Sequence, residues 1–157
     1  MSIKEIACCT DFSINADAAF SMALDMAEKY EAFLSVIHVM PPEVSPLSAG
    51  DGAAGAPPKS LVLEIEEKME QAYMKRIGAH VESECIVLAG HVSTELLKYL
   101  DENKPDLAIM GSYGLTGMGL VVFGSVAKRV AHKSPCSVMI VRPEEQPAAA
   151  ATESPRA

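Results

Sequence analysis

Half of the ten glycines lie in one 15-residue segment, Gly111-Ser-Tyr-Gly-Leu-Thr-Gly-Met-Gly-Leu-Val-Val-Phe-Gly-Ser125. Glycine permits positive φ and lets a ligand approach the backbone closely. The segment follows an apolar run and precedes an amphipathic one, so we expect it to join a strand to a helix. A helix N-terminus offers unpaired N–H groups and the positive end of the helix dipole. The segment therefore indicates a phosphate site; the alternative is that its glycines only turn a loop.

Two common phosphate-binding loops do not match this segment. Gly119 and Gly124 have the spacing of a Walker A loop, but Ser125 stands where the phosphate-binding lysine is required. Gly117-Met-Gly119 is followed by Val122 where a dinucleotide-binding motif needs its third glycine. A P-loop nucleoside triphosphatase and an ordinary dinucleotide-dependent dehydrogenase are thus disfavoured.

A second polar group, Thr10-Asp11-Phe12-Ser13, follows the first apolar run of the chain. The Asp11 carboxylate can accept hydrogen bonds from ribose hydroxyls or from an adenine amino group. It can also cap the helix that follows, and Ser125 has the same two interpretations at the later helix. Residue type alone leaves both open.

Short apolar runs alternate with amphipathic ones along the chain. We expect strands over residues 3–10, 32–40, 85–89, 106–110 and 136–141. We expect helices from Ser13 to Tyr30, from Ser60 to about Gly78, from Val92 to Leu100 and from Ser125 to Lys133. Apolar strands separated by such helices predict an α/β fold: a doubly wound, Rossmann-like, five-stranded parallel sheet with helices on both faces. Ligands of such sheets bind at the carboxyl ends of the strands.

The length of 157 residues suits one domain, which we place at residues 1–142. Eight of the ten prolines fall in residues 41–59 and 143–157. We expect the first segment to be a flexible insertion loop and the second a disordered tail. The loop follows a strand end beside the predicted site, so it is a candidate lid.

Net charge excludes several classes of partner. The chain has 13 Lys and Arg against 21 Asp and Glu, which gives a formal charge of -8. Nucleic acids and anionic membranes are bound mainly through Lys and Arg, so neither is expected. The first residues lack the basic-then-apolar layout of a signal peptide, and we expect a cytoplasmic protein.

The four cysteines, Cys8, Cys9, Cys85 and Cys136, match neither a CxxC redox motif nor a zinc pattern. We expect them to act as small core residues. The four histidines are scattered without ligand spacing. No metal ligand among the side chains is predicted.

The spacing Gly111-x2-Gly114-x9-Gly124-Ser125 resembles the nucleotide-binding motif of the universal stress protein family. Residues 10–13, 38–39, 90 and 134–141 are similar to other parts of that family, and the resemblance covers about residues 3–142. It implies a fold like that of the adenine nucleotide alpha hydrolases. The loop SGGxDS, which their hydrolase and ligase members carry after the first strand, is absent here.

The resemblance also implies a site and a ligand. ATP, or ADP or AMP, is expected, with Mg²⁺ held through the phosphates. Thr10, Asp11 and Val39 would contact the adenosine portion, and Met110 and Gly111 would lie near the ribose. Gly114, Gly124, Ser125 and Val126 would hold the phosphates.

The chain departs from the family at two places in the loop. Many members have basic residues in the nine-residue spacer, whereas residues 115–123 contain none, and Tyr113 stands where His is frequent. The nearest cations are Lys128 and Arg129. Backbone N–H groups and Mg²⁺ would then carry the charge compensation, which predicts modest affinity or a preference for a mono- or diphosphate.

The resulting hypothesis is a nucleotide-dependent stress-response or signalling module. No general base or nucleophile–base pair is recognisable, so hydrolysis is expected to be slow at most. The alternative is a dimeric interaction module of the same fold that binds no nucleotide. The resemblance implies a homodimer through the last strand, residues 136–141, unless the proline-containing tail covers that edge.

Overall fold

The computed structural model describes residues 2–42, 56–113 and 124–143. Within these ranges the chain forms a five-stranded parallel sheet with the strand order β3-β2-β1-β4-β5. The strands are β1 (Glu5–Thr10), β2 (Phe33–Met40), β3 (Ser83–Ala89), β4 (Leu107–Gly111) and β5 (Ser137–Val141). The strand order reverses between β1 and β4, so the predicted doubly wound α/β fold is confirmed.

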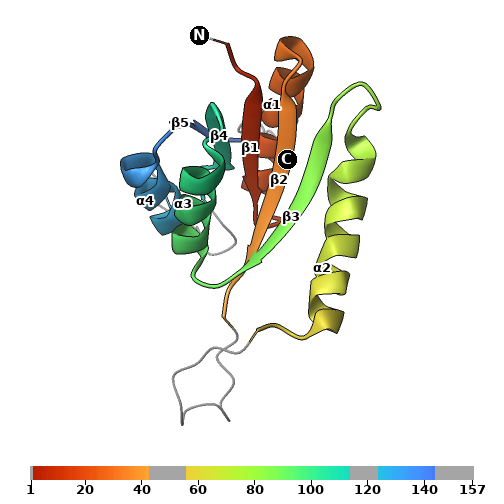
Figure 1. The fold of residues 1–157 in the computed structure, drawn as a ribbon, viewed down its shortest axis with the longest axis vertical. Coiled ribbons are helices and arrows are strands. Elements are labelled where there is room, and N and C mark those ends of the chain that lie inside the picture. The colour runs from red at the N-terminus through yellow and green to blue at the C-terminus, as the bar shows by residue number, and fades with distance from the viewer. Residues whose placement is uncertain (1, 43–55, 114–123, 144–157) are drawn as a thin grey trace, which may run out of the picture.

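Four α-helices cover the sheet in the described ranges: α1 (Ile14–Tyr30), α2 (Lys59–Ala72), α3 (Val92–Asn103) and α4 (Ser125–Lys133). Figure 1 shows α2 on the opposite side of the sheet from α3 and α4. Two buried clusters match these layers, one under α1 and α2 and the other under α3 and α4. The prediction of helices on both faces is therefore confirmed.

The second helix differs from its prediction at both ends. It begins at Lys59 with Pro58 as its N-cap, so Ser60 lies inside the helix and does not cap it. It ends at Ala72 because Tyr73 leaves helical backbone geometry, with φ −127°. A 3₁₀ turn, η1 (Met74–Arg76), follows in place of the predicted last helical turn.

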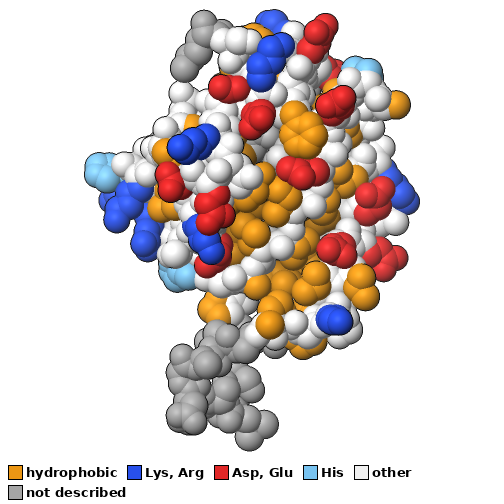
Figure 2. All heavy atoms as spheres, viewed as in Figure 1, with side chains coloured by type: hydrophobic (Ala, Val, Ile, Leu, Met, Phe, Trp, Pro, Cys, Tyr) orange, Lys and Arg blue, Asp and Glu red, His pale blue; other side chains and the backbone are white. Residues whose placement is uncertain are grey.

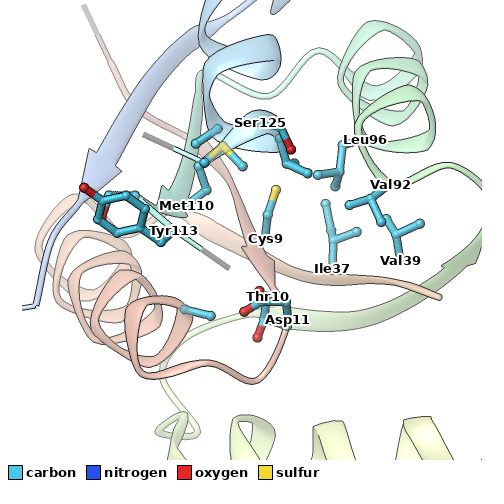
Figure 3. Close-up of a pocket in the computed structure, with 16 residues that line it drawn as sticks. Cys9, Thr10, Asp11, Ile37, Val39, Val92, Leu96, Met110, Tyr113 and Ser125 are labelled. Carbon is cyan, nitrogen blue, oxygen red and sulfur yellow. The ribbon is translucent and has the colours of Figure 1, made fainter. Parts of the chain in front are cut away.

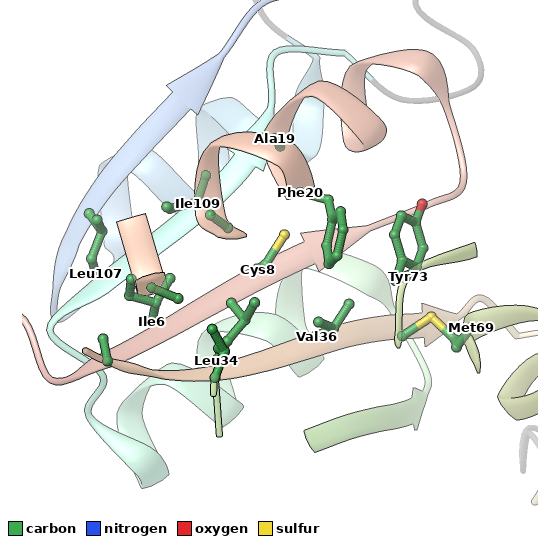
Figure 4. Close-up of a cluster of buried hydrophobic side chains, with 14 residues drawn as sticks. Ile6, Cys8, Ala19, Phe20, Leu34, Val36, Met69, Tyr73, Leu107 and Ile109 are labelled. Atoms are coloured by element: carbon green, nitrogen blue, oxygen red, sulfur yellow. The ribbon is translucent and has the colours of Figure 1, made fainter. Parts of the chain in front are cut away.

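Small side chains let α1 lie close to the sheet. Ala16, Ala19, Ala23 and Ala27 are all buried at helical spacing, and Phe20 fills the space between them and α2 (Figure 4). Alanine adds little bulk between the helix axis and the strands. This close approach decides the geometry of the site described below.

How deeply each cysteine is buried depends on where its strand lies in the sheet. Cys8 and Cys9 are buried in the central strand β1, and Cys136 is half-buried, but Cys85 is exposed. The expectation that all four lie in the core is wrong for Cys85, because β3 is an edge strand with β2 as its neighbour. Figure 2 shows apolar side chains exposed between α2 and α3, where β3 runs, with Asp and Glu around them.

Parts of two predictions fall outside the described residues. These parts are residues 43–55 of the expected loop and 144–157 of the expected tail. The loop, the tail and the domain boundary at residue 142 stay predictions. Among the described residues, no helix has both the length and the hydropathy needed to span a membrane.

Candidate functional site

A cavity of about 280 Å³ opens at the carboxyl ends of β1 and β4, where the strand order reverses. Its walls come from these strands, from β2, and from the first turns of α3 and α4 (Figure 3). Ligand sites of doubly wound sheets lie at this position. The volume is close to the lower limit of about 300 Å³ for small-molecule pockets.

Most of the predicted site residues meet in this cavity. Eight of them line it: Thr10, Asp11, Val39, Met110, Gly111, Gly124, Ser125 and Val126. The ninth, Gly114, lies outside the described residues. The structure thus brings together residues that are more than 100 positions apart in sequence, while their ligand stays a prediction.

One half of the cavity is apolar. Ile37 and Val39 of β2 face Val92 and Leu96 of α3, and Met110 of β4 closes the far side (Figure 3). Ile37, Val92 and Leu96 were not predicted as site residues. A flat, weakly polar ring such as a purine suits this wall.

The other half is the N-terminus of α4. Gly124 is the N-cap, and no side chain accepts a hydrogen bond there. The Gly124 N–H donates to the Ser112 carbonyl at 2.8 Å, whereas Ser125, Val126 and Ala127 follow along the cavity wall. The first turn therefore presents N–H groups and the positive end of the dipole to an anion.

Gly124 itself does not need the positive φ that glycine permits. Its backbone has φ −65° and ψ 159°, an extended conformation open to other residues. The missing Cβ atom would still let a ligand approach this backbone closely.

Glycine is needed at position 111 for a reason that does not involve a ligand. A Cβ atom at this position would lie 2.7 Å from the carbonyl carbon of Asn15 and 2.8 Å from its Cβ. Both belong to the first turn of α1, which the alanine face holds close to β4. Gly111 is therefore required for packing whether or not ribose binds beside it.

Ser112 is the site residue that sequence reasoning missed and the structure marks most clearly. Its side chain is fully buried (0% exposed) on the cavity wall, and its Oγ has no hydrogen-bond partner among the described residues. Its backbone is satisfied, because its N–H donates to the Val141 carbonyl at 2.9 Å. An unpaired buried hydroxyl costs about 1–3 kcal/mol. Because this Oγ has no exposed surface, a ligand in the cavity would reach it only if the wall at Ser112 opens on binding. Its position after Gly111 was the only hint in the sequence.

The turn after β1 has the opposite character. Asp11 Oδ1 accepts a hydrogen bond from the Ser13 N–H at 3.0 Å, and Ser13 Oγ accepts one from the Ala16 N–H at 3.1 Å. Ser13, as predicted, caps α1, while Asp11 closes the turn just before it. The Thr10 hydroxyl accepts from the Phe12 N–H at 3.1 Å and donates to the Tyr73 hydroxyl.

Charge in the described cavity wall is sparse. Asp11 is an acidic lining residue, and none of the lining residues that the structure describes is Lys, Arg or His. Burial raises the pKa of the Cys9 thiol to about 12, so this side chain is neutral at pH 7. Lys128 and Arg129 are exposed on α4 and do not line the cavity. Positive potential in this part of the wall comes from backbone N–H groups.

Comparison with known proteins gives one consistent family. The model of the universal stress protein family matches residues 2–142. A universal stress protein of Methanocaldococcus jannaschii is 30% identical over 146 residues, covering 88% of this chain and 82% of that protein. One of Bacillus subtilis is 30% identical over 132 residues, covering 79% and 88%.

Solved structures share the fold at lower identity. A universal stress protein from Lactobacillus plantarum has a TM-score of 0.73 at 21% identity, over 90% of this chain and 99% of that one. One from Archaeoglobus fulgidus, solved in complex with dAMP, has a TM-score of 0.64 at 20% identity, over 89% and 98%. Another, solved in complex with cAMP, has a TM-score of 0.63 at 24% identity, over 90% and 98%.

Proposed function

The chain belongs to the universal stress protein family, and we propose that it binds an adenine nucleotide in the cavity between β1 and β4. The base would lie against Ile37, Val39 and Leu96. The phosphates would accept hydrogen bonds from the first turn of α4. This arrangement matches an apolar ring and an anion to the two halves of the cavity.

The observation that carries the proposal is the unpaired Oγ of Ser112. Native proteins leave few buried polar atoms without a partner, so an orphaned hydroxyl on a cavity wall calls for an explanation. A ribose or phosphate oxygen would supply the partner if the wall at Ser112 opens when the ligand binds. The relatives in complex with dAMP and with cAMP support an adenine nucleotide as the class of ligand.

The finer proposal is ATP with Mg²⁺, acting in a nucleotide-dependent stress-response or signalling module. Because the described wall contributes no Lys or Arg, Mg²⁺ held by the phosphates would neutralise part of their charge. Both relatives' ligands carry one phosphate group, so AMP is the main alternative to ATP, and ADP is tested beside it. Without a clamp of cations, we propose binding with hydrolysis that is slow at most.

The test is Ser112→Ala, studied by calorimetric titration with ATP, ADP and AMP, each with and without Mg²⁺. We expect nucleotide affinity to fall about 5-fold, because one hydrogen bond to the ligand is lost. We expect the ligand-free protein to become more stable by about 1 kcal/mol, because the unpaired hydroxyl is removed. Opposite signs in these two measurements distinguish a ligand contact from a packing defect.

Ser93→Ala is the matched control. Ser93 is also buried, but its Oγ lies 3.3 Å from His91 Nδ1 and it does not line the cavity. This variant should lose stability and keep its nucleotide affinity. Equal affinity of Ser112→Ala and the unchanged protein would reject the assignment of Ser112 to the ligand.

The alternative is a module of the same fold that binds partners and no nucleotide. The absence of Lys and Arg from the described wall favours it. If denatured, freshly purified protein releases no nucleotide and ATP gives no thermal shift, this alternative replaces the first.

A homodimer through β5 is the proposed assembly. β5 lies at the edge of the sheet, and Val138, Met139, Ile140 and Val141 are all half-buried there. A second copy of the chain could cover an apolar sheet edge of this kind by pairing with it. Sedimentation at micromolar concentration tests it, and a concentration-independent monomer would reject it. A cytoplasmic location stays a prediction.

A further inference from the structure

A hydrogen-bond network behind the cavity joins α2 to the end of β1. Tyr73, the C-cap of α2, is 2% exposed, and its hydroxyl accepts a hydrogen bond from Thr10 Oγ1. The same Oγ1 accepts the Phe12 N–H at 3.1 Å. One phenolic oxygen, 63 residues from Thr10 in sequence, is thus connected to both residues that flank Asp11.

Phe12 shows that this turn is held against a local backbone preference. Its φ is +64°, in the left-handed region that a bulky residue rarely adopts. Its ring centroid lies 4.7 Å from that of His38 and 5.8 Å from that of Tyr73. The Lys68 ammonium lies 4.1 Å from the same centroid. Contacts from β2 and α2 therefore compensate for the unfavourable φ.

Tyr73 is itself fixed from the opposite side. Its ring centroid lies 4.9 Å from that of Phe20 in α1, and Figure 4 shows the two rings side by side in the core. The guanidinium carbon of Arg76 lies 4.7 Å from the centroid of the Phe20 ring, and Arg76 forms an ion pair with Asp17. The end of α2 is thus anchored to α1, independently of the turn that it contacts.

We propose that Tyr73 is a positioning residue for the cavity: through the Thr10 hydroxyl and the Phe12 ring it fixes the turn that carries Asp11 to the ligand. Tyr73 does not line the cavity, so its effect on binding is indirect. The role at the ligand rests on the proposed function. The role in the turn does not, and it is measurable without a nucleotide.

The test is Tyr73→Phe, which keeps the ring and removes the hydroxyl. In the ligand-free protein, we expect hydrogen exchange at the Phe12 and Ser13 amides to become about 5-fold faster, the effect of one lost hydrogen bond. Exchange at the Leu100 amide, on the other face of the sheet, should not change. Affinity for the adenine nucleotide should fall about 5-fold. The control is Tyr30→Phe, at the exposed end of α1, which should change none of these values.

A double-mutant cycle checks the route. Thr10→Val removes the other end of the same hydrogen bond and also the acceptor of the Phe12 N–H. The double variant should therefore exchange no faster at Phe12 than Thr10→Val alone. Unchanged exchange after Tyr73→Phe, additive effects in the cycle, or faster exchange with unchanged affinity would each overturn the proposal. If the unchanged protein binds no nucleotide, the proposed function fails, and exchange at Phe12 and Ser13 alone decides whether Tyr73 positions the turn.

Discussion

The polar groups that the structure describes in the two turns bordering the cavity differ in their hydrogen bonding. In the turn after β1, the Thr10 hydroxyl, the Asp11 carboxylate and the Ser13 hydroxyl each have a hydrogen bond within the protein. In the turn after β4, the Ser112 hydroxyl has none among the described residues, and no side chain caps the helix that begins at Gly124.

This difference indicates that the two turns have different roles in binding a ligand. A turn closed by its own hydrogen bonds is fixed before a ligand arrives, which lowers the entropy cost of binding. An unpaired buried hydroxyl destabilises the ligand-free state, and a ligand relieves this cost only if binding opens a path to the buried atom. In this protein the first turn would hold Asp11 in place and the second would receive the anionic part of the ligand.

The largest expected effect concerns close packing at Gly111, the last residue of β4, where the second turn begins. Gly111→Ala should lower the free energy of unfolding by about 3 kcal/mol, because the new Cβ would meet backbone atoms of Asn15. Urea denaturation measures this change. If the loss is small, α1 can move away from β4, and the second turn is less rigid than its contacts indicate.

Gly78→Ala is the control for that substitution. A Cβ at Gly78 would meet the imidazole of His80 at 2.5 Å, but this side chain is 69% exposed and can move. The expected loss of stability is below about 0.5 kcal/mol. A loss equal to that of Gly111→Ala would show that glycine replacement, and not the contact with Asn15, is responsible.

The next effect tests the unfavourable backbone of the first turn. Phe12→Gly and Phe12→Ala both remove the ring, but only alanine keeps the penalty for a left-handed φ. We expect the glycine variant to be the more stable of the two by about 1 kcal/mol, as measured by thermal or urea unfolding.

The same pair of substitutions at Asp25, an exposed residue within α1, should give the reverse order. There, glycine should be about 1 kcal/mol less stable than alanine. If alanine is also the more stable at Phe12, the left-handed φ imposes no penalty and the first turn is not strained.

The smallest effect is a pH dependence at the first turn. Burial lowers the pKa of His38, and Lys68 acts in the same direction, whereas the hydrogen bond to the Thr10 carbonyl and the Asp11 charge oppose it. The unfolded chain then takes up a proton at His38 before the folded one does. Stability should therefore be unaffected above about pH 6.5 and fall as the pH drops below it, towards the folded pKa.

Urea unfolding of the unchanged protein and of His38→Gln at pH 7.5 and 5.5 measures this dependence. The variant should lose less stability between the two pH values than the unchanged protein. Equal losses in both proteins would contradict a buried neutral His38.

Local patterns predicted the elements well where the chain has strong signals. The apolar run of β1, the Ser13 cap and the alanine face of α1 each specify their structure within a few residues. The errors occurred where a distant contact decides the outcome. Tyr73 ends α2 because its ring is buried beside Phe20, and Cys85 is exposed because β3 lies at the edge of the sheet.

The candidate site shows the same division. Thr10, Asp11, Gly124 and Ser125 were predicted as site residues because glycine and polar residues at strand ends are visible in the sequence, and the resemblance to one family added their spacing. Ile37 and Leu96 were not, because an apolar side chain that lines a cavity has the same local pattern as one in the core.

The sequence by itself determined the doubly wound fold, the end of the sheet where a ligand would bind and the family of the protein. These depend on periodicity and motif spacing, which are local properties. The tertiary structure decided which described polar atoms remain unpaired. It also decided that α1 packs so close to Gly111 that a side chain there would clash, and that Tyr73 forms a hydrogen bond with Thr10, next to Asp11. These depend on contacts between residues far apart in the chain, and such contacts exist only once the helices are packed on the sheet.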